Sequence, residues 1–295
     1  MKAQAKQLRH TMRRVLPRGV RRRVVALIPA QWWSWYRDWI SEAALVSFPK
    51  SGRTWVRVML GKAIALHYRV PASEDLLLLR KLSRVHPKLP EIQVTHDGLP
   101  HHRTPEEVGR AGQDFAGKRV IFLVRDPRDV VVSLYFHRTK RDESVGGGFY
   151  RGTISQFIRE DLGSLRTIIR YYNAWERARD RTGAFLQVRY EDLQSAPGAQ
   201  LRRILEFIGI ADPSDAVIAA AVEFAAFDNM RALEKEKVLS PLTPANEDDL
   251  ESFKTRRGVV GGFRDYLKQE DIEWMDELIR SELSAGYPEY RMGLQ

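Results

Sequence analysis

The sequence predicts a single α/β domain with a mainly parallel central sheet flanked by helices. Short apolar runs of strand length alternate with segments whose apolar residues recur at helical spacing. The run KRVIFLV (Lys118–Val124) is continuous and rich in β-branched residues, which is typical of a central parallel strand covered on both faces. No internal repeat is visible, and 295 residues are enough to bury a sizeable core. Strands separated by helices favour a parallel α/β fold.

The first strand, turn and helix form the segment around which the chain is organised. Leu45, Val46 and Phe48 predict a buried strand, and Pro49–Gly52 interrupts it. Thr54 begins a segment with helical spacing. Such a turn aims backbone N–H groups and a helix N-terminus at one point, which favours phosphate or sulfate. The pattern G-x-x-x-x-G-K-[ST] of a Walker A loop is not matched here.

The elements that follow are predicted from the same two periodicities. Further strands are expected at Ile92–Thr95, Lys118–Val124 and Ala184–Val188. Helices are expected from Pro127 through Leu134, at 154–179, Ala199–Ile208, Asp215–Phe224 and Asp271–Leu283. The remaining features are a Leu-rich segment at Leu76–Leu79, a flexible loop at Gly146–Gly148 and a long polar stretch over Lys235–Gly262.

Charge divides the chain into two regions. The formal net charge is +10, and residues 1–37 contain ten basic residues and no acidic one. Of the 48 basic residues 38 therefore remain, against 38 acidic residues, so the body is formally neutral. We predict a basic, tryptophan-rich extension at 1–40 and one folded domain at 41–295. This distribution argues against nucleic acid as the partner of the body.

The extension ends in an uncharged run, Val24–Tyr36, that contains Trp32, Trp33 and Trp35. Thirteen residues are too few for a spanning helix, which needs about 20. Tryptophans stand where a secretory signal would have a small-residue cleavage site. Basic residues beside an aromatic cluster suit an anionic membrane surface, but the tryptophans could equally pack on the domain. The absence of cysteine excludes disulfides and fits a reducing, cytoplasmic compartment.

Residues at the carboxyl ends of the predicted strands suggest an anion-binding site. In an open parallel sheet, ligands bind beyond these ends. The strand-end residues are Lys50 with Ser51, Thr95 with His96, Arg125, and Arg189 with Tyr190. Cations, hydroxyls and one histidine describe an anion site with a single candidate base. His101 and His102 are adjacent and lack an acidic cluster, so the sequence predicts no metal site.

Five motifs in this sequence resemble those of the sulfotransferase family, enzymes that use 3′-phosphoadenosine 5′-phosphosulfate (PAPS). FPKSGRTW (Phe48–Trp55) resembles the 5′-phosphosulfate loop, YPKSGTTW. VRDPRDVVVS (Val124–Ser133) resembles the 3′-phosphate motif, and RRGVVGGFRDYL (Arg256–Leu267) resembles the C-terminal RKGxxGDWK segment. VRYEDL (Val188–Leu193) and AAFDNMR (Ala225–Arg231) are similar to two further family stretches. The resemblance covers about residues 43–290 and implies a P-loop-NTPase-like sheet.

The resemblance also implies roles for individual residues. Lys50 would contact the 5′-phosphosulfate and stabilise the leaving phosphate oxygen, and His96 would be the catalytic base. The backbone of Ser51, Gly52, Arg53 and Thr54 would cradle the 5′-phosphate. The 3′-phosphate would lie against Arg125, Ser133, Arg256, Arg257 and Gly258. The adenine would lie among Trp55, Tyr190, Phe227 and Met230. These groups supply the positive charge, so no metal is expected.

The sequence departs from the family pattern at several places. Arg53 replaces a usual threonine, Val94 replaces a lysine of many small-molecule enzymes, and Ala225 and Ala226 lack the usual hydroxyls. The dimerisation motif of some cytosolic members is not recognisable around Arg264–Asp271, which leaves the oligomeric state open.

These features favour in-line sulfuryl transfer from PAPS to a hydroxyl or amine, with a small-molecule, glycan or lipid-linked acceptor. A nucleotide kinase of similar architecture is an alternative, although a Walker A glycine and a Mg²⁺-binding Asp cannot be placed. A non-enzymatic protein that binds membranes or nucleic acid through residues 1–37 is another. Given the arm's charge and tryptophans, a peripheral membrane position and a glycan or lipid-linked acceptor are our preferred hypotheses.

Overall fold

We describe the protein from a computed structural model. It describes residues 41–292, except 71–78, 80–81, 83–85, 87–88, 143–147, 238–245 and 247. The basic extension, most of the Leu-rich segment and most of the predicted glycine loop therefore lie outside the described residues. None of the helices within the described ranges is long and apolar enough to cross a membrane.

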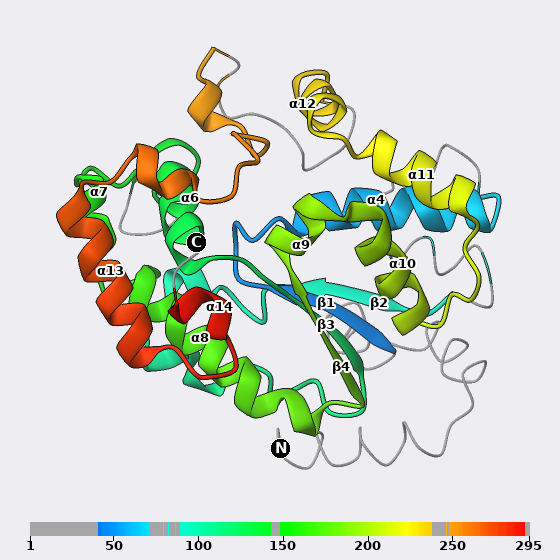
Figure 1. The fold of residues 1–295 in the computed structure, drawn as a ribbon, viewed down its shortest axis with the longest axis horizontal. Coiled ribbons are helices and arrows are strands. Elements are labelled where there is room, and N and C mark those ends of the chain that lie inside the picture. The colour runs from blue at the N-terminus through cyan, green and yellow to red at the C-terminus, as the bar shows by residue number, and fades with distance from the viewer. Residues whose placement is uncertain are drawn as a thin grey trace.

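A four-stranded parallel sheet in the order β2-β1-β3-β4 forms the centre of the molecule (Figure 1). The strands are β1 (Ala43–Ser47), β2 (Ile92–Thr95), β3 (Arg119–Val124) and β4 (Ala184–Arg189). All four match the predicted positions within a residue or two. The inner strand β3 pairs β1 on one side, with Ile121 opposite Leu45, and β4 on the other. The parallel α/β fold predicted from the sequence is confirmed.

Helices cover both faces of this sheet (Figure 1). On one face the helices that follow β1 and β4 pack together; they are α4 (Arg53–His67), α9 (Tyr190–Ser195), α10 (Pro197–Phe207), α11 (Asp215–Phe224) and α12 (Phe227–Lys235). The other face carries α6 (Pro127–Lys140), α7 (Ile154–Phe157), α8 (Leu165–Ala178), α13 (Gln269–Glu282) and α14 (Pro288–Arg291). Short 3₁₀ helices are η3 (Pro100–His102), η4 (Glu107–Arg110), η5 (Arg179–Arg181), η6 (Leu250–Ser252) and η7 (Gly262–Asp265).

The two helical layers bury two separate hydrophobic cores. Leu45, Ile121 and Leu123 belong to the core under α4, α10 and α11. Their neighbours Val46 and Phe122 belong to the core under α6, α8 and α13. This division follows from the strand period of two, which sends successive side chains to opposite faces. Continuous apolar strands are thus required on the inside of the sheet.

One predicted helical region differs from the structure. Residues 154–179 form two helices, α7 and α8, rather than one. Gly163 lies between them at φ +71, and a Cβ at this position would collide with the carbonyl oxygen of His101. The break is therefore imposed by a close approach to η3, which helical periodicity alone does not reveal.

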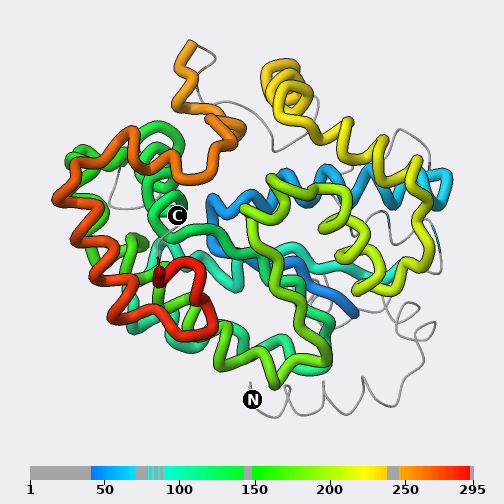
Figure 2. The backbone as a smooth tube through the Cα atoms, viewed as in Figure 1, coloured from blue at the N-terminus to red at the C-terminus, as the bar shows by residue number. Residues whose placement is uncertain are grey.

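The predicted polar stretch before α13 returns the chain from α12 to α6 (Figure 2). Its described residues, 235–237, 246 and 248–262, include η6 and the start of η7, and both of these 3₁₀ helices contact α6. This return brings residues 254–262 beside the carboxyl ends of β1 and β3, more than a hundred residues away in the sequence.

Candidate functional site

The turn between β1 and α4 opens the site. Lys50 and Gly52 both adopt positive φ, 73 and 90 degrees. A Cβ at Gly52 would lie 2.6 Å from the ring of Tyr190, so only glycine fits there. Lys50 carries a Cβ, which disfavours positive φ. A left-handed lysine therefore indicates local backbone strain of the kind found at functional sites. The turn thus holds its backbone in an uncommon, tightly packed conformation.

The N-terminus of α4 faces this turn without a side-chain cap. Gly52 occupies the N-cap position and offers no side-chain oxygen to the first N–H groups of the helix. The first turn contains no acidic residue. Free N–H groups and the helix dipole make such a terminus a site for an anion.

A cavity of about 540 Å³ lies over the turn and the carboxyl ends of the strands. Every site residue predicted from the sequence lines this cavity except Ser51, which is fully buried beneath it. The residues that it brings together are Lys50, Gly52, Arg53, Thr54, Trp55, His96, Arg125, Ser133, Tyr190, Phe227, Met230, Arg256, Arg257 and Gly258. The burial of Ser51 concerns its side chain, and its predicted role, which uses only its backbone N–H, stays a prediction.

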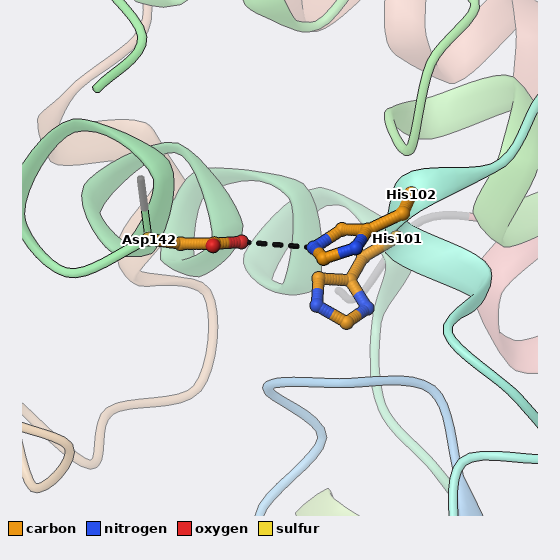
Figure 3. A group of neighbouring side chains, drawn as sticks. All are labelled: His101, His102 and Asp142. Carbon is orange, nitrogen blue, oxygen red and sulfur yellow. Dashed lines mark hydrogen bonds and ion pairs between the residues drawn. The ribbon is translucent and has the colours of Figure 1, made fainter. Parts of the chain in front are cut away.

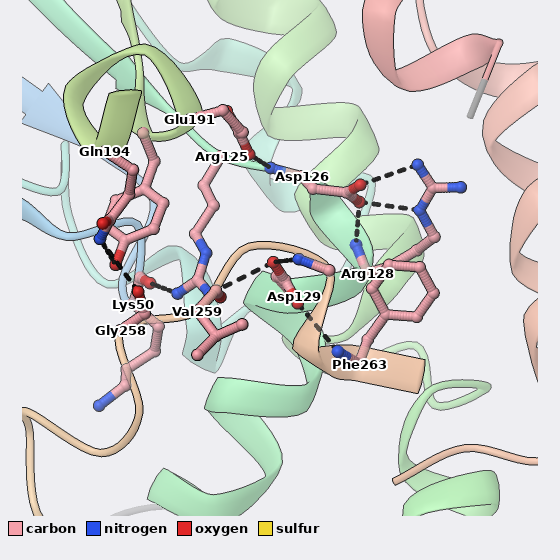
Figure 4. Close-up of polar contacts among 12 residues, drawn as sticks. Lys50, Arg125, Asp126, Arg128, Asp129, Glu191, Gln194, Gly258, Val259 and Phe263 are labelled. Atoms are coloured by element: carbon pink, nitrogen blue, oxygen red, sulfur yellow. Dashed lines mark hydrogen bonds and ion pairs between the residues drawn. The ribbon is translucent and has the colours of Figure 1, made fainter. Parts of the chain in front are cut away.

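Arg125, immediately after β3, ties three segments together (Figure 4). Its Nη2 donates to the carbonyl of Val259 at 2.9 Å and lies 3.3 Å from a carboxylate oxygen of Asp129. Its guanidinium carbon lies 4.4 Å from the ring centroid of Tyr190. Nη1 reaches the carbonyl of Lys50 at 3.5 Å. Strand β3, the β1–α4 turn and the segment after η6 therefore meet at one guanidinium.

Asp129 fixes the same segment from α6. Its two carboxylate oxygens accept from the backbone N–H groups of Gly261, at 2.8 Å, and Phe263, at 3.0 Å (Figure 4). Arg256 and Arg257 in this segment pair with Glu251 and Asp265 respectively. A bound phosphate would therefore share these two arginines with carboxylates already in place.

Aromatic rings close one side of the cavity. Trp55 packs edge-on against Tyr190, with ring centroids 5.8 Å apart, and its Nε1 donates to the carbonyl of Ala225 at 2.8 Å. A Cβ at Gly258 would lie 2.8 Å from the ring of Phe227, which is 41% exposed. These rings form an apolar slot suited to a planar base.

His96, just beyond β2, is held in one orientation. Its Nδ1 lies 2.8 Å from the carbonyl oxygen of Ser47. A carbonyl only accepts, so Nδ1 carries the proton and Nε2 keeps its lone pair. Burial, followed by the charge of Arg53, holds the pKa of His96 well below its usual 6.5. The imidazole is therefore neutral at pH 7 and able to accept a proton.

Lys50 is the cation within the β1–α4 turn itself. Burial, together with the charges of Arg141, Lys254 and Arg256, lowers its pKa to about 7 despite the opposing effect of Glu234. The ammonium group therefore loses its proton more readily than an exposed lysine does. An anion beside the ammonium group would raise this pKa again, so binding and protonation of Lys50 are coupled.

Three further histidines, His101, His102 and His137, lie close to the site. The rings of His101 and His102 in η3 are 4.0 Å apart, and His101 and His137 line the cavity. His102 Nε2 lies 3.0 Å from Asp142, and one ligand atom each from His101, His102 and Asp142 lie within 4.8 Å of one another (Figure 3). The argument that these adjacent histidines lack an acidic partner is wrong, because folding supplies Asp142 from beyond α6.

This group nevertheless lies in a positive field. Burial and nearby charges, which include Arg138 and Lys50, lower the pKa of His101 to about 4. The same cations oppose a divalent metal ion. We therefore describe the group as a hydrogen-bonded pair of His102 and Asp142 with the imidazole of His101 beside it.

Several cavity residues were missed by the sequence analysis. Arg57 lies one helical turn after Arg53 on α4, and that spacing is a signal that could have found it. His137 follows Ser133 on α6 and Gln194 follows Tyr190 on α9 at the same interval, whereas Lys254 reaches the cavity only through tertiary folding. Gln194 donates to the carbonyl of Gly258 at 3.0 Å, which links α9 to the returning segment.

The comparisons with known proteins agree with this geometry. A family model described as "Sulfotransferase domain" matches residues 41–287. The chain belongs to the sulfotransferase family. All five motifs identified in the sequence lie within the matched range.

Curated sulfotransferases share its sequence at moderate identity. A "Flavonol sulfotransferase-like" protein of Flaveria bidentis is 27% identical over 264 residues, covering 83% of this chain and 82% of its own. "Cytosolic sulfotransferase 17" of Arabidopsis thaliana is 24% identical over 267 residues, covering 81% and 73%. The chain is thus a PAPS-dependent sulfotransferase.

Solved structures share the fold. Mouse sulfotransferase SULT7A1 complexed with PAP superposes with a TM-score of 0.57 at 19% identity, covering 85% of this chain and 88% of its own. Retinol dehydratase in complex with androsterone and PAP gives 0.53 at 18% identity, covering 82% and 80%. PAP here is adenosine 3′,5′-bisphosphate, the product that remains when PAPS has lost its sulfuryl group.

Proposed function

We propose that the cavity described above binds PAPS and transfers its sulfuryl group to an acceptor hydroxyl or amine. One observation carries this proposal: the uncapped α4 N-terminus, Arg125 and His96 converge on a single cavity although they follow three different strands. The Gly52 cradle, the cationic wall and the aromatic slot fit a nucleotide with phosphates at both ends. A kinase assignment is not favoured, because the turn lacks the Walker A pattern.

The predicted donor-binding roles are compatible with these positions. Lys50 and the N–H groups of residues 51–54 are our candidates for the 5′-phosphosulfate, and Trp55 and Tyr190 for the adenine. Arg125 and Ser133 come from the same motif, eight residues apart, and both line the cavity. With Arg256, Arg257 and Gly258 they are our candidates for the 3′-phosphate. Phe227 and Met230 complete the base pocket.

The transfer itself needs a base and a cation. The acceptor oxygen forms a bond to sulfur while the bond from sulfur to the 5′-phosphate oxygen breaks, and PAP leaves with that electron pair. His96 accepts the acceptor's proton through Nε2, because Nδ1 is already committed to Ser47. Lys50 stabilises the charge that develops on the departing phosphate oxygen.

PAP is expected to bind the wild-type protein and raise its Tm. At a hundredfold excess over Kd, binding to the folded state stabilises it by about 2.7 kcal/mol, which raises Tm of a domain of this size by about 5 °C. Differential scanning calorimetry and isothermal titration at about 1 mM ligand measure both effects. The comparison ligand is ATP, which lacks a 3′-phosphate for Arg125. Binding of ATP without binding of PAP would contradict the proposal.

We further propose that the enzyme is cytoplasmic and acts at a membrane surface on a glycan or lipid-linked acceptor. Four relatives are named cytosolic sulfotransferases, and the chain contains no cysteine. The whole net charge of +10 lies in residues 1–37, beside three tryptophans. Relatives named for flavonols make a free phenol the competing acceptor class.

Full-length protein is expected to sediment with vesicles that contain phosphatidylserine and not with phosphatidylcholine vesicles. Each basic residue near an anionic surface contributes about 1 kcal/mol, and salt screens this attraction. Deletion of residues 1–37 should abolish sedimentation while PAP binding shows that the domain remains folded. Equal sedimentation of both proteins, or sedimentation unaffected by salt, would rule out the arm as the membrane anchor.

A further inference from the structure

Arg53 is a cation in an unfavourable position. It is the first residue of α4, where the helix dipole disfavours positive charge, and the first turn holds no acidic residue. The residue is half-buried, but its Nη1 is enclosed and has no hydrogen-bond partner. Buried donors are nearly always paired in folded proteins, so an unpaired guanidinium nitrogen in a cavity suggests a ligand.

The neighbours of Arg53 make its positive charge still less favourable. Arg57, one turn further along α4, and Lys254 line the same cavity. Burial and the charge of Arg57 lower the pKa of Arg53 to about 9, which leaves it cationic at neutral pH. Burial, Arg141, Arg57 and Arg53 similarly lower the pKa of Lys254 to about 8, despite the opposing effect of Glu234. The three positive groups therefore repel one another across a common space.

The carboxylates near the cavity do not compensate Arg53. Among the residues that the structure describes, Asp129 is the single carboxylate on the cavity wall, and it already binds Arg125, Gly261 and Phe263. Glu234 is fully buried behind the wall, where its carboxylate accepts from the backbone N–H groups of Lys254 and Thr255. None of the ion pairs within the described ranges includes Arg53.

Arg53 also lies on the side of the cavity where the acceptor must react. Its charge is the second-largest influence on the pKa of His96, after burial, which places the guanidinium close to the candidate base. The arginines that are candidates for the nucleotide, Arg125, Arg256 and Arg257, lie outside α4. Each of them has a carboxylate partner of its own. Only the backbone of Arg53 belongs to the 5′-phosphate cradle, so its side chain is available for another group.

We propose that Arg53, supported by Arg57 and Lys254, binds an anionic group of the acceptor, a carboxylate or a phosphate or sulfate ester, while the acceptor's hydroxyl faces His96. This inference rests on the proposed sulfuryl transfer and specifies its substrate class. A guanidinium binds the paired oxygens of such groups in two parallel hydrogen bonds. An anion there would supply the partner that Nη1 lacks and offset the repulsion among the three cations.

The test compares two ligands of nearly equal shape, 4-hydroxyphenylacetate and its neutral amide, 4-hydroxyphenylacetamide. Each is titrated by isothermal calorimetry into protein saturated with PAP, so the donor site is occupied throughout. Wild-type protein should bind the carboxylate about 10-fold or more tightly than the amide, as expected for a charged hydrogen-bonded pair. Raising the salt concentration should reduce this ratio.

Three variants make the result specific. Arg53→Thr should bring the ratio to about one, whereas Arg53→Lys should keep part of the preference because it keeps the charge. Arg170→Thr removes an exposed arginine of α8 and the same unit of net charge, and it should keep the wild-type ratio. Lack of any carboxylate preference in wild-type protein, including no binding of either ligand, would overturn the proposal. So would an unchanged ratio in Arg53→Thr. Failure of PAP itself to bind would instead contradict the proposed function.

Discussion

Replacing His96 with glutamine is expected to lower kcat by about 100-fold to 10,000-fold, the usual contribution of a general base. Glutamine retains an amide that can donate to the Ser47 carbonyl, as Nδ1 does at 2.8 Å, but it cannot accept a proton at neutral pH. The loss should therefore appear in turnover, while PAP still binds. Steady-state transfer of labelled sulfate and calorimetric titration of PAP separate the two effects.

The pH profile provides a second readout for His96. A base acts only when neutral, so activity falls as pH drops through its pKa. Because burial and Arg53 hold that pKa well below 6.5, wild-type turnover should stay nearly constant between pH 7.5 and the usual histidine value. His67→Gln, at the end of α4, is the matched control and should retain the wild-type rate. Near-normal turnover in His96→Gln would remove His96 as the base.

Replacing Lys50 with alanine is expected to weaken both PAP binding and transfer. Loss of a charged hydrogen bond to phosphate costs about 1.5–3 kcal/mol, or about 10-fold to 150-fold in affinity. Transfer should fall further than binding, because Lys50 also stabilises charge that develops only as the phosphate oxygen departs. Arg125→Ala should weaken PAP binding comparably, through loss of the 3′-phosphate contact. Its effect on kcat at saturating PAPS should be smaller.

Lys50 also makes PAP binding depend on pH. Its pKa is about 7 in the free protein, and a phosphate partner raises it, so binding favours the protonated lysine. Affinity should therefore decrease as pH rises above 7. Lys50→Arg should weaken this dependence, since arginine stays charged. Lys62→Ala, which changes a half-buried lysine of α4 over the ring of Phe224, serves as the control. Unchanged PAP binding and transfer in Lys50→Ala would exclude the assigned role.

The strands were predictable because their signals are local. β3 and β1 are buried on both faces, so they must be apolar throughout, and parallel pairing makes their run lengths short and similar. The division of helical region 154–179 was not predictable. It depends on the carbonyl of His101 approaching Gly163, a contact between segments about sixty residues apart. Hydrophobic periodicity predicts which face of a helix is buried, but it does not predict a contact with a distant segment.

The site shows the same distinction. Lys50, Gly52 and Arg53 lie within four successive residues, so their motif was visible, and Arg125 stands eight residues before Ser133 of α6. Arg57 follows Arg53 at a helical interval that was available but not used. His137 follows Ser133 on α6 at the same interval. Lys254 carries no such local signal and reaches the cavity wall because the chain near η6 packs against α6.

The sequence by itself determined the parallel α/β class, the family resemblance and the strand-end residues, because each of these depends on short-range pattern. It also revealed the arm's charge. Tertiary structure decided which cations have partners. Arg125, Arg256 and Arg257 meet carboxylates contributed by other segments, whereas the Nη1 of Arg53 is enclosed without a partner. Electrostatic energy depends on distance and burial rather than on sequence separation, so only the folded chain distinguishes a paired arginine from one available to a substrate.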